Sequence, residues 1–415
     1  MVHQDNQWLY KCQACEKMFS LKRHLWQCPD CQGLLDLIFQ DERGPAWQTD
    51  PLKSGLWRYQ SMLPVFEDGK IGERYSQQGR LSENIPEASG PPEKSWCNKS
   101  QIKTLGEGWT PLHIFSFHDQ DIWLKHDYLC PTGSYKDRGA VLMVQNAARL
   151  GIQEVVEDSS GNAGCAVAAY CALNQIKCTI YLPESTSPGK IKQVTAYGAR
   201  IKKIPGSRQA TSLAIREAAK SQTYLSHIYD PFFYQGTKTI AYEIFEQTGG
   251  QMPKQLVVPA GHGTMLLGLY MGLSHLRAIG KIKALPRLIA VQAENCAPLY
   301  HAANKAGLKT GCADSGHSLL SAGQFLETVA EGIAISQPPR LKQMLEAIKE
   351  TDGQIEVVTE DEIKQALADA CEHGLYIEPT SAVVLAAVTR LGKKDKMTGR
   401  TICMLSGHGL KASLY

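Results

Sequence analysis

Short apolar segments and helical patterns alternate along most of this 415-residue chain. Runs of four or five apolar residues suit strands, and the longer periodic segments between them suit helices. Strands are predicted over 154–158, 179–183, 256–259, 288–291 and 401–405, with helices over 163–173, 189–197 and 265–279. Parallel strands are joined by crossover connections that usually contain a helix, so this alternation predicts an α/β fold built on parallel sheets.

The bulk composition is that of an ordinary globular protein. With 43% apolar residues, the chain can build buried cores, and its length suggests two to three domains of about 150 residues each. The formal net charge is only +3, without a basic stripe, so we expect no nucleic-acid partner. The first residues carry no signal-peptide pattern and no apolar run approaches the ~20 residues of a bilayer span, so we expect no membrane partner and a cytoplasmic location.

Four of the thirteen cysteines form two closely spaced pairs near the N-terminus. Cys12 and Cys15 make one pair, and Cys28 and Cys31 make the other. Four thiolates in this spacing can surround one Zn²⁺ tetrahedrally, which leaves no position for water and indicates a structural zinc ribbon. A redox pair is the weaker interpretation, and His24 is surplus to a four-cysteine site. Because zinc ribbons also occur in binding proteins, a non-enzymatic binding module remains a second hypothesis.

Lys136 stands just before an apolar run that predicts a buried helix. Ser134 and Asp137 form a capping-box pattern, and the helix would run through 140–150 and end at Gly151. Lys136 then falls in the first turn, where the positive end of the helix dipole disfavours an ammonium. Such a lysine can bind a carbonyl cofactor covalently, whereas the simpler interpretation is a solvated surface lysine.

Three turns rich in glycine and hydroxyl groups follow predicted strands. Ser159-Ser160-Gly161-Asn162 opens a helix, and the free N–H groups of a helix start suit a carboxylate. Gly261-His262-Gly263-Thr264 repeats this arrangement, and its glycines allow a phosphate to approach closely. Ser406-Gly407-His408-Gly409 follows the last strand. Each turn taken alone is also compatible with an ordinary connection.

Together these segments resemble the threonine synthase-like branch of pyridoxal phosphate enzymes, the group that also holds tryptophan synthase β and the serine/threonine dehydratases. The resemblance covers the chain from about residue 105 to its end, and four further segments carry it: 105–112, 189–190, 330–334 and 378–382. It implies two parallel-sheet α/β domains with the cofactor in the cleft between them, behind the zinc ribbon. The implied boundaries are 1–40 for the ribbon, 41–139 with 239–415 for the large cofactor-binding domain, and 140–238 for a smaller mobile domain.

The resemblance also implies roles for individual residues. Lys136 would hold pyridoxal 5'-phosphate and then act as the base at the α carbon of the substrate. Further cofactor contacts would come from Asn162, Gly261, His262, Gly263, Thr264 and Ser406. Substrate contacts would come from Ser159, Ser160, Gly161, Lys190 and Asp230. A neutral hydroxyl at Ser406 would leave the ring nitrogen of the cofactor largely unprotonated, which suits elimination and replacement reactions.

Four positions depart from the pattern with which the family binds O-phosphohomoserine. They are Asp230 and Phe233, where asparagine and arginine often hold the substrate phosphate, together with Ala163 and Cys130, where threonine and asparagine are usual. Losing a cation and gaining a carboxylate weakens the binding of a dianion. Lys190 and Lys238 are expected to compensate in part.

The first expectation for function is formation of L-threonine from O-phosphohomoserine and water, with release of phosphate. The alternative within enzymes is β-elimination or β-replacement on serine, threonine or a phosphoserine-like amino acid. Either reaction implies a small amino-acid substrate as the partner, and homodimers are usual for the family.

Overall fold

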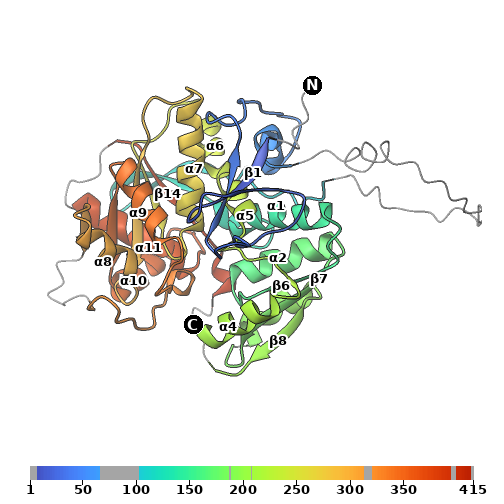
Figure 1. The fold of residues 1–415 in the computed structure, drawn as a ribbon. Coiled ribbons are helices and arrows are strands. Elements are labelled where there is room, and N and C mark those ends of the chain that lie inside the picture. Colours follow the sequence, from blue (N-terminus) through green and yellow to red (C-terminus); the bar gives the residue numbers. More distant parts are fainter. Residues whose placement is uncertain are drawn as a thin grey trace, which may run out of the picture.

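The computed structural model describes residues 7–65, 102–186, 188–206, 208–312, 320–393 and 399–412, which form three sheets and the helices around them (Figure 1). Two of the sheets are built mainly or wholly from parallel strands, and the third is a small antiparallel sheet near the N-terminus. The predicted α/β fold is therefore confirmed.

The largest sheet has seven strands in the order β12-β13-β11-β10-β14-β5-β4. In this order their bounds are Thr310–Cys312, Gln354–Val358, Arg287–Ala293, Gln255–Pro259, Thr401–Met404, Gln120–Lys125 and Leu112–Phe117. Neighbours are parallel except β4 and β5, which pair antiparallel at one edge. The sequence predicted parallel pairing, and this hairpin departs from it because His118 (φ 48°) and Asp119 (φ 59°) form a two-residue turn.

Both faces of this sheet are covered by helices. On β10, Leu256 and Val258 belong to the core beneath α7 (Thr264–Ala278) and α9 (Leu341–Glu350). Val257 belongs instead to the core beneath α10 (Glu360–Glu372) and α11 (Pro379–Lys393). Successive side chains of a strand point to opposite faces, so an apolar run such as this one suits a strand that is buried on both sides.

The second parallel sheet has four strands in the order β8-β7-β6-β9. Their bounds are Arg200–Ile204, Lys177–Pro183, Glu154–Glu157 and Thr223–Tyr224. The helices that connect or cover them are α1 (Lys136–Arg149), α2 (Asn162–Leu173), α3 (Pro188–Ala196) and α4 (Arg208–Ala218). The predicted strands over 154–158 and 179–183 and the predicted helices over 163–173 and 189–197 are confirmed to within a few residues.

The remaining helices are α5 (Pro231–Thr237), α6 (Thr239–Gln247) and α8 (Pro298–Lys305). In Figure 1, α5 and α7 lie between the orange and red helices of the large sheet and the green four-stranded sheet. Among the described residues, no helix is both long enough and apolar enough to cross a bilayer.

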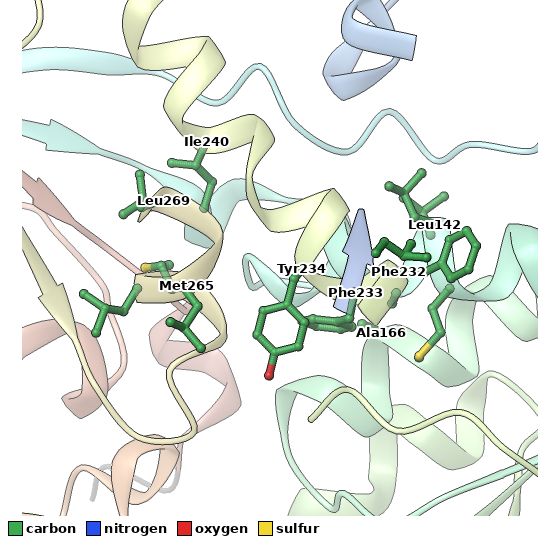
Figure 2. Packing of buried hydrophobic residues seen from close by; sticks show 14 of the residues in the cluster. Leu142, Ala166, Phe232, Phe233, Tyr234, Ile240, Met265 and Leu269 are labelled. Atoms are coloured by element: carbon green, nitrogen blue, oxygen red, sulfur yellow. The ribbon is translucent and has the colours of Figure 1, made fainter. Parts of the chain in front are cut away.

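Helices α1 and α5 approach each other closely at the centre of the molecule. A Cβ atom on Gly236 would lie 1.8 Å from the carbonyl oxygen of Arg138, and one on Gly139 would lie 2.5 Å from the Phe233 ring. Neither clash is tolerable, so glycine is required at both positions. Figure 2 shows Phe232, Phe233 and neighbouring apolar side chains of this shared core. The core fixes α1, and therefore Lys136, relative to both parallel sheets.

The N-terminal sheet has the order β2-β1-β3, with bounds Met18–Ser20, Trp8–Cys12 and Leu35–Phe39. It packs on α5, where the Tyr10 ring meets the Phe232 ring edge to face at 6.2 Å between centroids. His24, which the sequence left without a role, lies 3.0 Å from the carbonyl oxygen of Tyr224 through Nε2. Arg340 donates to the carbonyl oxygen of Leu35 at 2.8 Å. The ribbon is thus held by contacts to both parallel-sheet regions.

Candidate active site

A cavity of 1880 Å³ opens where the carboxyl ends of strands from both parallel sheets meet. The turns after β6, β10 and β14 and the start of α1 line it. Loops at the carboxyl ends of parallel strands are the usual location of ligand sites in such folds. The sequence-predicted residues at this cavity are Lys136, Ser159, Ser160, Gly161, Asn162, Gly261, His262, Gly263, Thr264 and Ser406. Separate stretches of sequence are therefore brought to one place.

Lys136 was predicted in the first turn of a helix, and it is the first residue of α1. Its side chain reaches across to the start of α7. Its Nζ donates to Oγ1 of Thr264 at 2.9 Å, and the Tyr135 hydroxyl lies 2.8 Å from the same oxygen. Nζ also lies 4.9 Å from the centroid of the Tyr135 ring and 5.5 Å from that of Phe233. The amine is thus held half-buried at the cavity wall between two aromatic rings.

The helix start itself differs from the prediction. The N-cap residue of α1 is Tyr135, not Ser134, and no side chain at this position accepts a hydrogen bond from the first backbone N–H groups of the helix. Asp137 instead turns back and accepts the backbone N–H of Thr132 at 2.7 Å. The capping-box prediction is therefore wrong, because the chain before α1 folds into a tight turn that offers Asp137 a closer partner. Burial raises the pKa of Asp137 to about 7.

The turn from Gly261 to Thr264 has the close backbone packing expected of a phosphate cradle. Gly263 has φ 81°, and a Cβ atom there would lie 2.3 Å from Sδ of Met344. A Cβ atom on Gly261 would lie 2.9 Å from Cα of Ile333. Helix α7 begins at Thr264, so its unpaired N–H groups and positive dipole end lie at the cavity. These features fit the phosphate of a cofactor.

The turn after β6 is tied to the neighbouring strand by a buried carboxylate. Glu157, the last residue of β6, accepts the backbone N–H of Ser159. Its other oxygen lies 2.8 Å from Nδ1 of His227, a cavity residue that follows β9. A Cβ atom on Gly164 would lie 1.9 Å from the carbonyl oxygen of Ser159, so the turn closes directly onto the first turn of α2. The resulting helix start suits a substrate carboxylate.

Glu378 joins two of the predicted residues, and the sequence reasoning missed its role. Its carboxyl accepts from Nδ2 of Asn162 at 2.8 Å and from Oγ of Ser406 at 2.8 Å. Burial raises the pKa of Glu378, while the two hydrogen bonds oppose that shift. The available signal was the segment 378–382, which contributed to the resemblance without an assigned function.

Two residues expected at the substrate lie away from the cavity wall, among the residues that the structure describes. Asp230 caps α5 by accepting the backbone N–H of Phe232 at 2.9 Å, and burial raises its pKa to about 6. Lys238 donates to Gln235, and its Nζ lies 4.9 Å from the Trp8 ring centroid. Burial lowers the pKa of Lys238 to about 7. Both side chains therefore belong to the interior around α5.

Other cations line the cavity instead. Lys411, in the short helix η5 (Gly409–Lys411), donates to the carbonyl oxygen of Thr132 at 2.7 Å and to Oε1 of Gln193 at 2.9 Å. Lys192, in α3, is an exposed residue of the same wall. The side chain of Lys190 lies outside the described atoms, although its backbone belongs to α3. Only the chain's return after the last strand brings Lys411 to α3, so periodicity could not reveal it.

The four N-terminal cysteines lie together, with all sulfur atoms within 4.8 Å of one another. Cys12 Sγ is 3.4 Å from Cys31 Sγ, and Cys15 Sγ is 3.7 Å from Cys28 Sγ. Tetrahedral Zn²⁺ with ~2.3 Å bonds to sulfur would place its ligands about 3.8 Å apart. The cluster therefore fits a four-thiolate zinc ion.

Comparison with known proteins agrees with this site. Residues 103–407 match the family described as "Pyridoxal-phosphate dependent enzyme". The chain is 29% identical to threonine synthase of Methanocaldococcus jannaschii over 97% of this chain and 93% of that one. It is 31% identical to threonine synthase of Bacillus sp. (strain ULM1), over 75% of this chain and 86% of that one.

The crystal structure of a T.th. threonine deaminase superposes with a TM-score of 0.59 and 25% identity, covering 72% of this chain and 92% of that one. The likeness thus extends from the sequence to the fold. This chain therefore belongs to the family of pyridoxal-phosphate dependent enzymes, as a relative of the threonine synthases.

Proposed function

We propose that this protein forms L-threonine from O-phosphohomoserine and water and releases phosphate. The observation that carries the proposal is the position of Lys136, which lies at the cavity and is hydrogen-bonded to Thr264 of the glycine turn. The proposal is supported by the similarity to a threonine synthase over 97% of this chain. An amine beside a phosphate cradle is the arrangement that a carbonyl cofactor with a phosphate requires.

The residues at the cavity fit pyridoxal 5'-phosphate. Lys136 would bind its carbonyl carbon, the turn from Gly261 to Thr264 its phosphate, Asn162 its phenolic oxygen and Ser406 its ring nitrogen. When bound, the cofactor supplies an electron sink that stabilises negative charge at the substrate carbons. His262, which is half-buried at the same turn, would contact the phosphate region.

The protein's own groups would orient the substrate and move its protons. The start of α2, from Ser159 to Asn162, offers backbone N–H groups to the substrate carboxylate. Lys136 Nζ would take the proton from the α carbon, and the Thr264 hydroxyl, 2.9 Å away, would hold the amine in place for that transfer. The α2 start and Lys136 lie on different elements of one cavity, so a substrate can contact both.

The leaving phosphate needs a cation, and the structure changes which residues can supply it. Phe233 is fully buried beneath Lys136, and Asp230 and Lys238 are directed into the core around α5. Lys192 and Lys411 are the lysines of α3 and η5 that line the cavity. We propose that these two residues bind the phosphate that asparagine and arginine often bind in the family.

The apolar surroundings of Phe233 favour a second candidate. Among the described residues no arginine lines the cavity, which also suits β-elimination or β-replacement on serine or threonine, whose leaving groups carry less charge than phosphate. A phosphoserine-like amino acid, the third substrate of this kind, would need Lys192 and Lys411 for its phosphate in the same way. The two functions differ in product: one yields threonine and phosphate, the other releases ammonia or a replaced amino acid.

The deciding experiment supplies holoenzyme with O-phosphohomoserine, serine and threonine in separate reactions. We expect threonine and phosphate in equal amounts from the first substrate and little ammonia from the other two. No turnover of O-phosphohomoserine together with ammonia from serine or threonine would replace the first function with the second. Lys136→Ala protein, assayed in parallel, controls for contaminating activity.

Structural zinc at the four cysteines is part of this proposal, supported by their mutual distances. The division into a ribbon (1–40), a large domain (41–139 with 239–415) and a smaller mobile domain (140–238) is likewise a proposal, supported by the separate sheets. The homodimer and the cytoplasmic location stay predictions.

A further inference from the structure

His227 and Glu157 form a buried pair of an imidazole and a carboxylate at the cavity wall. Oε1 of Glu157 lies 2.8 Å from Nδ1 of His227. Glu157 is fully buried at the end of β6, whereas His227, which is 4% exposed, follows β9 and lines the cavity. The proposed mechanism uses neither group, although burying a carboxylate is unfavourable unless its partners are well placed.

The bond to Glu157 determines which edge of the imidazole serves a ligand. Glu157 also accepts the backbone N–H of Ser159, so both of its oxygens are engaged. An ionised carboxylate can only accept, so Nδ1 of His227 carries a hydrogen in this pair. Contact with a ligand is then made by Nε2, on the other edge of the ring. The carboxylate also stabilises the ring when both nitrogens are protonated, which suits a histidine that transfers a proton.

Three parts of the chain hold the backbone next to His227. Nε of Arg340, at the start of α9, donates to the carbonyl oxygen of Ile228 at 3.2 Å. The hydroxyl of Tyr234, in α5, donates to the same oxygen at 2.8 Å. Arg340 also donates to the carbonyl oxygen of Leu35 in the ribbon at 2.8 Å. The imidazole is therefore attached to a fixed backbone, as a group that must meet a reacting atom requires.

The Phe233 ring lies next to both His227 and Lys136. Its centroid is 5.5 Å from Nζ of Lys136 and 6.0 Å from the centroid of the His227 ring. A substrate whose α carbon contacts Lys136 can therefore extend its side chain towards His227 within the same cavity. Phe233 itself has no proton to give, whereas an imidazolium has one.

Every substrate considered for this site leaves through an oxygen atom that needs a proton. A phosphate monoester dianion whose carbon–oxygen bond breaks departs as a trianion unless one of its oxygens is protonated. A hydroxyl group likewise departs as hydroxide unless it is protonated. Chloride, in contrast, departs as a stable anion without any proton. A proton donor beside the leaving group therefore accelerates the first two reactions and not the third.

We propose that His227 is a catalytic residue that protonates the departing oxygen of the substrate, and that Glu157 is the positioning residue that holds the imidazole for this step. The proton on Nε2 passes to the oxygen while the bond between that oxygen and the substrate carbon breaks. The electron pair of this bond leaves with the oxygen, and the electrons of the C–H bond opened by the base form the new C=C bond. The imidazolium becomes a neutral imidazole and regains a proton from solvent. This inference rests on the substrate site of the proposed function.

The test compares oxygen and chloride leaving groups on otherwise matched substrates. Wild-type and His227→Gln holoenzymes receive L-serine beside β-chloro-L-alanine, and O-phosphohomoserine beside the γ-chloro analogue of homoserine. Glutamine keeps a polar side chain but transfers no proton, so kcat should fall by roughly 10²-fold for the oxygen leaving groups and stay nearly unchanged for chloride. Equal losses on both members of a pair would overturn the proposal. A wild-type enzyme that turns over only the chlorinated substrates would overturn it as well.

Matched variants separate this role from a general effect on the site. Glu157→Gln should show the same selective loss, because an amide does not stabilise the protonated ring. Both members of a pair use the turn at Ser159 for their carboxylate, so damage to that turn would appear in both rates. His118→Gln is the control, since His118 lies 2.7 Å from the Asp369 carboxylate in a pair that does not line the cavity, and neither rate should change.

Nitrogen-15 NMR of histidine-labelled protein supplies a readout that is independent of turnover. The signals that disappear in His227→Gln identify the ring. We expect Nδ1 to stay protonated as pH rises, while Nε2 loses its proton at a midpoint that lies lower in Glu157→Gln, because the buried counter-ion is gone. The ratio of the serine rate to the chloroalanine rate should fall through the same midpoint. A neutral ring with its hydrogen on Nε2 would overturn the proposal.

Other titratable groups surround the pair, and the ratio of rates removes their influence because each acts on both leaving groups. They come from every neighbouring element: Asp158 after β6, Tyr224 of β9, Asp230 before α5, His262 before α7, Lys136 of α1, and Cys165 and Cys171 of α2.

The two substrate pairs also keep a failure of this inference distinct from a failure of the proposed function. If O-phosphohomoserine is not turned over while the serine pair shows the selective loss, the threonine-forming activity fails and the role of His227 stands. If His227→Gln forms threonine from O-phosphohomoserine at the wild-type rate, the role of His227 fails and the proposed function stands.

Discussion

The cofactor-facing wall and helix α5 contribute very differently to this molecule. At the wall, the turns at Ser159–Asn162 and Gly261–Thr264 lie together with Lys136 and Ser406, as the sequence predicted. In α5 and its flanks, Asp230 and Lys238, both expected to contact the substrate, lie away from the cavity. Wall residues follow parallel strands, whose ends meet at one edge of a sheet, whereas α5 is enclosed by other elements.

The enclosure of α5 explains why its polar residues do not reach the cavity. The ribbon covers it: Tyr10 packs on Phe232, and Trp8 lies over the Nζ of Lys238. Asp230 Oδ2 lies 3.6 Å from Nδ1 of His24. Polar groups in this segment therefore serve to dock the N-terminal sheet. A residue that aligns with a substrate-binding position of the family therefore predicts substrate binding only when its side chain has no structural partner elsewhere in the fold.

The largest expected effect tests the wall. Lys136→Ala should lower turnover by roughly 10³-fold, because both the covalent anchor and the base for the α carbon are removed. The preparation should lose its yellow colour. The measurement is visible absorption after incubation with cofactor and removal of the unbound cofactor by dialysis. Lys364→Ala, which changes an exposed lysine at the cavity rim, should keep both colour and turnover. A coloured, active Lys136→Ala protein would remove the basis for the proposed function.

The next largest effect is expected at the N-terminal ribbon, which covers α5. Cys28→Ser should release the metal and lower the free energy of unfolding by several kcal/mol, since metal binding supplies the folding energy of small zinc ribbons. Metal content and a denaturant titration measure both changes. The chromophore should persist, because Lys136 is held by Thr264 at the start of α7 and by the Tyr135 and Phe233 rings, which lie outside the ribbon. Cys371→Ser, in α10 and outside the cluster, is the control; equal losses in the two variants would argue against zinc.

A smaller effect is expected from replacing the glycines next to the two ends of α7. The comparison separates the cost of backbone strain from the loss of cofactor binding. Gly263→Ala forces φ 81° on alanine and places its Cβ 2.3 Å from Met344, whereas Gly280→Ala meets φ 73° with open space around it. The strain alone should cost about 1 kcal/mol at both ends. Only Gly263→Ala should lose stability beyond that and weaken cofactor binding, measured by titration of apoprotein. Equal cofactor affinities would show that the turn does not hold the phosphate.

The smallest effect is a pH dependence at α5. Burial raises the pKa of Asp230 to about 6, against an ordinary value near 3.9 in an unfolded chain, and His24 opposes the shift. The folded state therefore binds this proton more tightly, and the carboxyl makes stability fall as pH rises from about 4 to about 6. Asp230→Asn keeps the cap on Phe232 but removes this titration, so the variant should gain about 2 kcal/mol relative to wild type at ~pH 8 compared with ~pH 4.

Urea denaturation of wild type and Asp230→Asn at both pH values measures this difference. Any effect of pH on the zinc site is common to the two proteins and cancels in the comparison. Asp361→Asn, which removes an exposed carboxyl in α10, is the matched control. If Asp230→Asn behaves in the same way, Asp230 is not desolvated and the packing of α5 beneath the ribbon needs revision.

Much of the fold was predictable, because strands buried on both faces read as continuous apolar runs and three of the five predicted strands were followed by a helical pattern. The strand from Gln255 to Pro259 and the helix from Thr264 to Ala278 lie within one residue of their predicted positions. The β4–β5 hairpin was not predicted, since its turn residues, His118 and Asp119, are not glycine or asparagine. The capping of α1 was predicted wrongly, because Asp137 found a partner at Thr132.

The sequence by itself determined the local chemistry of this protein: an amine at a helix start, glycine turns after strands and four cysteines in two pairs. Each depends on residues close together in the chain, where backbone geometry restricts what they can do. Only the tertiary structure decided that Glu378 bridges Asn162 and Ser406, that Lys411 reaches α3, and that α5 docks the ribbon. Those contacts join residues far apart in sequence, and their energies depend on burial and on partners that no local pattern contains.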